Sequence, residues 1–109
     1  MPVARASSDA FHAIADPTRR AILEALAPEG VRRTAGELGE RFSLRQPTVS
    51  QHLKVLREAG LVTARDEGRC RIYELRLAPL EPVKAWMEGV MGFDDVAGHV
   101  WSVKSKKES

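Results

Sequence analysis

Apolar residues recur at helical spacing in residues 43–62, a segment that also carries many small polar side chains. Val49, Leu53 and Leu56 lie at i, i+4 and i+7, which places them in one stripe of an α-helix that must pack on a neighbouring element. Gly60 follows where the chain must leave this helix with a positive φ angle. The polar residues gather on another side of the helix: Gln46, Pro47, Ser50, Gln51 and Lys54.

This polar side has the chemistry of a DNA-recognition helix. Amides and hydroxyls can hydrogen-bond to base edges, and a lysine can bind a phosphate. The alternative is the ordinary solvated side of an amphipathic helix. We favour DNA recognition because the neighbouring segments on both sides complete a DNA-binding pattern.

A short helix is predicted over residues 34–42, directly before the recognition helix. Thr34 and Glu37 have the spacing of a capping box, in which each side chain accepts a hydrogen bond from the other residue's backbone amide. Ser43 and Leu44 leave room only for a tight connection. The spacing therefore predicts a helix-turn-helix over residues 34–59.

Two β-capable runs follow Gly60 and predict a hairpin, or wing, over residues 61–76. A turn that contains Gly68 separates the two runs. The hairpin carries Arg65, Arg69 and Arg71, which are either edge-strand charges that discourage aggregation or contacts to phosphate and the minor groove. We favour the DNA contact for Arg69 and Arg71, which flank the tip, and leave Arg65 open.

Helices are predicted on both sides of this central unit. Two helical pieces occupy residues 8–27, and Asp16 with Pro17 begins the second as N-cap and first helical residue. A further helix opens at Pro79 or Pro82, and Gly92 interrupts it. The apolar residues of these helices exceed what one small core needs. A dimer interface is predicted for several of them, with packing in a single core as the alternative: Phe11, Val83, Trp86, Met87, Val90 and Trp101.

Three polar side chains outside the DNA-reading set are expected to have structural roles. Arg19 and Arg20 lie in the first turn of a helix, where their charge opposes the helix dipole, which indicates either a structural ion pair or a phosphate contact. We favour the ion pair. His52 lies beside the apolar stripe, so it is expected to pack or hydrogen-bond within the fold.

Size and charge limit the possible functions. The 109 residues suffice for one domain, residues 1–109, and the net charge is only +2. The positive charge is local, because residues 45–76 carry seven basic against four acidic side chains. No known catalytic constellation is placed sensibly, so the chain is not expected to be an enzyme. A single cysteine, Cys70, and the lack of any long apolar run favour a cytoplasmic protein without a membrane segment.

The order helix, helix, helix-turn-helix, arginine-tipped hairpin, helix resembles the ArsR-type family of bacterial repressors. Residues 16–23, 46–62 and 68–73 carry the resemblance. It implies a mainly α winged helix-turn-helix fold with a small β-hairpin. It also implies a homodimer that pairs through about residues 8–15 and 79–103 and binds a palindromic operator in double-stranded DNA. The predicted DNA-binding residues are Arg45, Gln46, Pro47, Thr48, Ser50, Gln51, Lys54, Arg69 and Arg71.

The chain departs from the metal-sensing members of this family. Those members carry two cysteines where Gly39 and Arg41 stand here, and others use Asp and His on the last helix, whereas residues 79–91 contain neither. The chain therefore resembles the metal-independent branch, with no metal or cofactor and an unknown inducer. Regulation by its own concentration is the preferred interpretation. A small molecule at the dimer interface, a partner protein and a redox signal at Cys70 are the alternative signals. A protein-binding adaptor without DNA affinity is the alternative function.

Arg45 is a further departure. Many relatives have a serine or threonine at this position, whose hydroxyl can cap the recognition helix, and the loss of such a cap costs about 1 kcal/mol. A contact between Arg45 and a DNA phosphate is expected to offset this loss.

Overall fold

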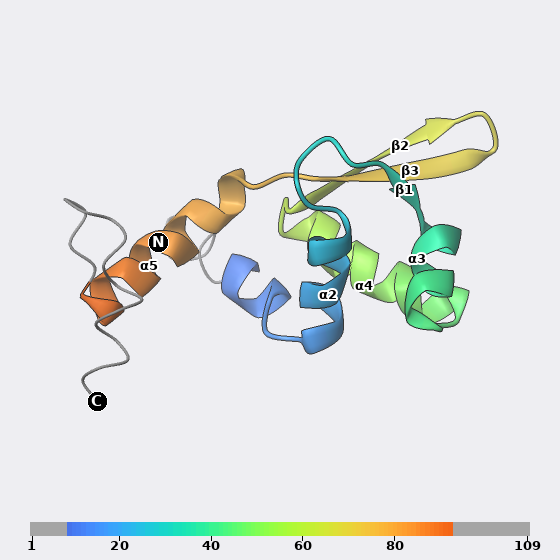
Figure 1. The fold of residues 1–109 in the computed structure, drawn as a ribbon. Coiled ribbons are helices and arrows are strands. Elements are labelled where there is room, and N and C mark those ends of the chain that lie inside the picture. Colours follow the sequence, from blue (N-terminus) through green and yellow to red (C-terminus); the bar gives the residue numbers. More distant parts are fainter. Residues whose placement is uncertain (1–8, 93–109) are drawn as a thin grey trace.

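Residues 9–92 of the chain are described by the computed structural model, as a helical body from which a β-hairpin projects (Figure 1). Residues 9–13 form a first helical turn. The predicted mainly α fold with a small wing is confirmed. The elements follow in the order α2 (Pro17–Ala25), β1 (Arg33–Thr34), α3 (Ala35–Phe42), α4 (Gln46–Glu58), β2 (Val62–Glu67), β3 (Cys70–Leu75), a 3₁₀ turn (Ala78–Leu80) and α5 (Glu81–Met91).

The start of α2 is set by a side-chain cap, as predicted. The Asp16 carboxylate accepts hydrogen bonds from the backbone amides of Thr18, at 2.8 Å, and Arg19, at 3.0 Å, and Pro17 is the first helical residue. These bonds satisfy two amides that have no partner within the helix. The helix ends at Ala25, two residues before the predicted end.

The predicted ion pair of Arg19 and Arg20 is wrong within the described residues. Arg19 donates to the carbonyl oxygens of Ala13, at 2.6 Å, and His12, at 3.0 Å, and Arg20 donates to that of Ile14. These carbonyls lie at the C-terminal end of the first helical turn, where a helix carries partial negative charge. The two cations therefore close the preceding helix instead of pairing with an acidic side chain.

The helix-turn-helix is present with both of its predicted signals. The Thr34 hydroxyl accepts from the Glu37 amide at 3.1 Å, and the Glu37 carboxylate accepts from the Thr34 amide at 2.8 Å. Ser43 then adopts a left-handed conformation with φ of 56°, which reverses the chain, and the Leu44 amide donates to the Gly39 carbonyl at 2.8 Å. The turn between α3 and α4 is therefore closed by the backbone itself.

The wing lies where it was predicted, but β2 runs further toward the turn than expected and a third strand joins the hairpin. β2 continues to Glu67, so only Gly68 and Arg69 connect the two long strands. β1 pairs antiparallel with β3 and gives the order β1-β3-β2. β1 was missed because its two residues are too few to show an alternating pattern.

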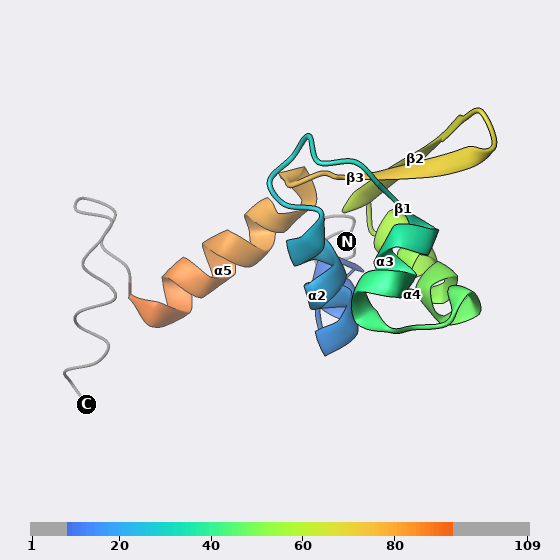
Figure 2. The same ribbon diagram turned by 45° about the vertical axis from the view of Figure 1, so that its right-hand side comes forward.

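The core lies where α2, α3 and α4 meet one face of the sheet. Val49, Leu53 and Leu56 of α4 are almost fully buried, which confirms the predicted stripe. The hydrophobic cluster also contains side chains from α2, from α3 and from both long strands, among them Ile22, Leu26, Leu38, Leu61, Val62, Tyr73 and Leu75. α5 extends away from this body (Figure 2).

Gly39 of α3 lies directly against the backbone of the turn that precedes α4, so a larger residue there should destabilise the protein. A Cβ on Gly39 would lie 3.0 Å from the Leu44 carbonyl oxygen, so Gly39→Ala must displace the backbone of the turn. We expect Gly39→Ala to lower the free energy of unfolding by about 1–3 kcal/mol, measured by urea denaturation.

Gly36, in the same helix, provides the matched control. A Cβ on Gly36 meets only the Thr34 hydroxyl, at 3.8 Å. Because alanine is a better helix former, Gly36→Ala should stabilise the protein by about 0.5–1 kcal/mol. Equal effects of the two substitutions would show that the contact with Leu44 does not determine the turn.

Candidate nucleic-acid interface

The polar side of α4 is open to solvent over its whole length. Because the stripe of Val49, Leu53 and Leu56 faces the core, the opposite side of the helix points outward. The structure therefore brings the predicted recognition-helix residues onto one exposed surface: Arg45, Gln46, Pro47, Thr48, Ser50, Gln51 and Lys54.

The two glutamines of α4 differ in their surroundings. The Gln46 side-chain oxygen lies 3.7 Å from the position that a Cβ on Gly39 would occupy. The Gln46 side chain is therefore directed toward α3 and the turn. Gln51 lies in the middle of the exposed side, one helical turn before Lys54. The helix begins without a side-chain cap, since the Arg45 side chain makes no capping hydrogen bond. Its guanidinium remains available at the N-terminus of the helix.

Arg57 is a candidate that sequence analysis missed. It is exposed in the last turn of α4, and it forms no ion pair with any residue in the described range 9–92. Its spacing of i+7 from Ser50 and i+3 from Lys54 could have indicated it. Its charge also suits the C-terminal end of a helix.

The three arginines of the wing have different partners. Arg69 lies exposed at the tip, with no ion pair to another described residue. The Arg71 Nε atom lies 3.2 Å from an Asp66 carboxylate oxygen. Arg65 is paired with Glu67, at 3.0 Å, and with Glu74, at 3.6 Å. Of these three arginines, only Arg69, at the tip, has no carboxylate partner among the described residues.

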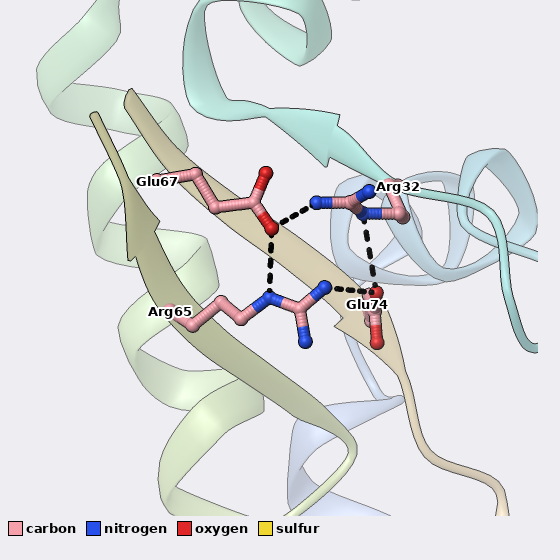
Figure 3. A network of polar contacts seen from close by, with 4 residues as sticks. All are labelled: Arg32, Arg65, Glu67 and Glu74. Atoms are coloured by element: carbon pink, nitrogen blue, oxygen red, sulfur yellow. Dashed lines mark hydrogen bonds and ion pairs between the residues drawn. The ribbon is translucent and has the colours of Figure 1, made fainter. Parts of the chain in front are cut away.

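Arg65 belongs to a network of four charges on the outer face of the sheet (Figure 3). Arg32, which precedes β1, contacts the same carboxylate oxygen of Glu67 and lies 3.4 Å from Glu74. The hydrogen bond from the Arg32 guanidinium is the main influence that holds the pKa of Glu67 below its ordinary value of 4.5. Sequence analysis missed Arg32 because 35 residues separate it from Glu67.

His52 lies inside the fold, as predicted. Its side chain is largely covered, and its Nδ1 atom is buried without a hydrogen-bond partner among the described residues. That atom lies 3.9 Å from the Asp16 carboxylate. His52 therefore lies where α4 approaches the capped start of α2.

α5 carries an apolar side that the rest of the chain leaves largely uncovered. Trp86 is 57% exposed and Val90 is 64% exposed, whereas Val83 is buried in the protomer. The Trp86 ring meets Phe11 edge to face, with ring centroids 5.6 Å apart. Met87 is also exposed. Trp101, predicted for the same interface, lies outside the described residues.

Residues 9–92 contain neither a metal-ligand cluster nor a membrane-spanning helix. No group of three or more His, Cys, Asp or Glu side chains there is placed to hold a metal ion. The metal-independent interpretation stays a prediction. No helix within that range is long and apolar enough to cross a membrane. Cys70 is exposed at the start of β3.

Comparisons with known proteins agree with this geometry. Residues 14–65 match a family described as a helix-turn-helix domain. The transcriptional repressor SdpR of Bacillus subtilis is 36% identical over 80 residues, which cover 73% of this chain and 87% of SdpR. The HTH-type transcriptional regulator Rv2034 of Mycobacterium tuberculosis is 38% identical over 98 residues, which cover 85% of this chain and 90% of that regulator.

A solved structure shows the same fold. The crystal structure of the ArsR family transcriptional regulator RHA00566 superposes with a TM-score of 0.70 at 30% identity, covering 81% of this chain and 89% of that one. The chain belongs to the ArsR family of helix-turn-helix transcriptional regulators. It is thus a member of a family of DNA-binding regulators, not of enzymes.

The capped start of α2 leads to a prediction for acid stability. The Arg19 amide that donates to Asp16 is the main influence that lowers the pKa of this carboxyl below its ordinary value of 3.8. Because the folded pKa is the lower one, the charged cap stabilises the protein above about pH 4, and this contribution is lost as the pH falls through the folded pKa.

Asp16→Asn keeps an oxygen that can cap α2 but does not titrate. We therefore expect the melting temperature of the variant to fall less than that of the wild type between about pH 5 and pH 2, measured by circular dichroism. Parallel curves for the two proteins would contradict a role for the Asp16 charge.

Proposed function

We propose that this ArsR-family regulator represses transcription as a homodimer bound to an inverted-repeat operator. The observation that carries the proposal is the exposed polar side of α4. In a two-fold dimer, the two copies of α4 enter successive major grooves, about one helical turn of DNA apart, and the wings lie outside them. Binding by a two-fold dimer requires an operator with matching symmetry.

The surroundings of each side chain support a division of roles. Ser50 and Gln51 stand in the middle of α4 and read base edges. Arg45, Lys54 and Arg57 bind phosphates at either end of this surface, and Arg69 at the wing tip contacts phosphate or the minor groove. Gln46, which leans over the turn, supports the start of α4 and makes a weaker base contact.

The dimer forms through α5 and the first helical turn. Trp86, Met87 and Val90 present a continuous apolar surface that a monomer would leave in water. An open hollow of about 570 Å³ beside this surface, between α2 and α5, is lined mainly by apolar side chains, including Leu23 and Met87. A second copy that covers α5 removes both from solvent.

The regulatory signal that fits this dimer best is the concentration of the protein itself. A dimer that forms and binds its operator only above a threshold concentration needs no ligand. Release from the operator by stoichiometric metal would contradict this part of the proposal.

Two substitutions in α4 separate base reading from phosphate binding. Gln51→Ala should relax the preference for one base pair by about 1–3 kcal/mol. Lys54→Ala should weaken binding to every sequence alike and reduce the salt dependence by about one phosphate contact per subunit. Fluorescence anisotropy with selected and scrambled duplexes, at several salt concentrations, measures both effects. If both variants lost the same degree of base preference, the division of roles would be wrong.

Trp86→Ala tests the dimer. The loss of an aromatic contact in the middle of an interface should raise the dissociation constant of the dimer tenfold or more, measured by sedimentation equilibrium. The protomer loses only the ring contact with Phe11, about 0.5–1.5 kcal/mol. Glu40→Ala, at an exposed position of α3 that does not line the hollow, is the control and should leave the dimer intact. Unchanged association of the Trp86 variant would place the interface elsewhere.

A further inference from the structure

The charge network on the wing joins parts of the chain that are distant in sequence. Arg32 precedes β1, Arg65 and Glu67 belong to β2, and Glu74 belongs to β3. Each arginine contacts both glutamates, so the four side chains form a closed ring of alternating charge (Figure 3). The ring has no net charge.

The ring lies on the solvent face of the sheet. Arg65, Glu67 and Glu74 point away from the core, because Ala64 and Tyr73, their neighbours in the alternating pattern, point toward it. The side chains of Arg32 and Arg65 remain 43% and 57% exposed. Both guanidinium groups are therefore within reach of an external anion but are already occupied by carboxylates.

We propose that Glu67 and Glu74 hold Arg32 and Arg65 away from DNA phosphates and so limit the affinity of the wing for DNA of any sequence. This inference rests on the proposed function, in which the wing approaches the duplex. The two glutamates leave Arg69, at the tip between the two long strands, as a cation that has no carboxylate partner among the described residues and can meet the backbone of DNA. They are specificity-determining residues that touch no base.

The physical basis is competition between carboxylate and phosphate for the same guanidinium groups. A contact between arginine and phosphate carries no sequence information, and each one adds about 0.9 to the slope of log affinity against log salt concentration. Four free arginines per dimer would therefore strengthen binding to all the DNA of a cell, which competes with the operator for the protein. The pairing with glutamate removes this contribution without removing the arginines.

The test compares two double variants on a duplex of random sequence. Glu67→Gln with Glu74→Gln removes the carboxylates of the ring and frees both arginines. Glu29→Gln with Glu40→Gln removes the same charge from exposed glutamates that form no ion pair with any described residue and do not line the hollow beside α5. Anisotropy titrations between about 50 and 300 mM NaCl give the affinity and the salt slope of each protein.

We expect the ring variant to bind random duplex at least about tenfold more tightly than the wild type at low salt. We expect its salt slope to be steeper by about two to four. The control should change the slope by less than about one, because no arginine is released. Glu67→Asp keeps the charge but shortens the side chain, so it should shift affinity in the same direction as the ring variant.

Three outcomes overturn the inference. A ring variant with the wild-type slope, or a control that steepens it equally, would show that the glutamates do not restrain the arginines; wild-type binding to DNA would leave the proposed function intact. A wild-type protein that binds no duplex would overturn the proposed function and this inference with it. Circular dichroism shows whether each variant is folded, and Glu67→Gln alone replaces the double variant if that protein does not fold.

Discussion

Burial of one side of α4 is the interaction on which the rest of this structure depends. Val49, Leu53 and Leu56 each remove nearly all of their surface from water, and each such burial contributes about 1.5–3 kcal/mol. This burial determines the rotation of α4 about its own axis. The same contact that stabilises the core therefore holds the polar side of the helix outward, where Gln51 and Lys54 can meet DNA.

The elements around α4 keep it in position by directional contacts. The backbone bond from Leu44 to Gly39 closes the turn before the helix, and His52 lies against the Asp16 cap of α2. Arg19 and Arg20 close the first helical turn through its carbonyl oxygens. The hydrogen bonds made by Leu44, Arg19 and Arg20 contribute orientation more than stability, because each replaces a bond to water.

Two parts of the surface differ in how far the chain satisfies its own side chains. α5 leaves Trp86 and Val90 in solvent, which is costly for a monomer and consistent with a partner surface. The wing does the reverse, since its ring satisfies the charges of Arg32 and Arg65 within the protomer. In the proposed function, association through α5 and restraint on the wing together set how the protein is distributed between its operator and other DNA.

The sequence alone determined the features that depend on near neighbours along the chain. The caps at Asp16 and Thr34, the stripe of α4 and the stop at Gly60 were all predictable, because a helix brings residues three or four apart together. Only the tertiary structure decided the two-residue strand β1, the partners of Arg19 and the ring that joins Arg32 to Glu67. These contacts form between segments whose separation in sequence carries no periodic signal, so the packing of the core had to bring them together first.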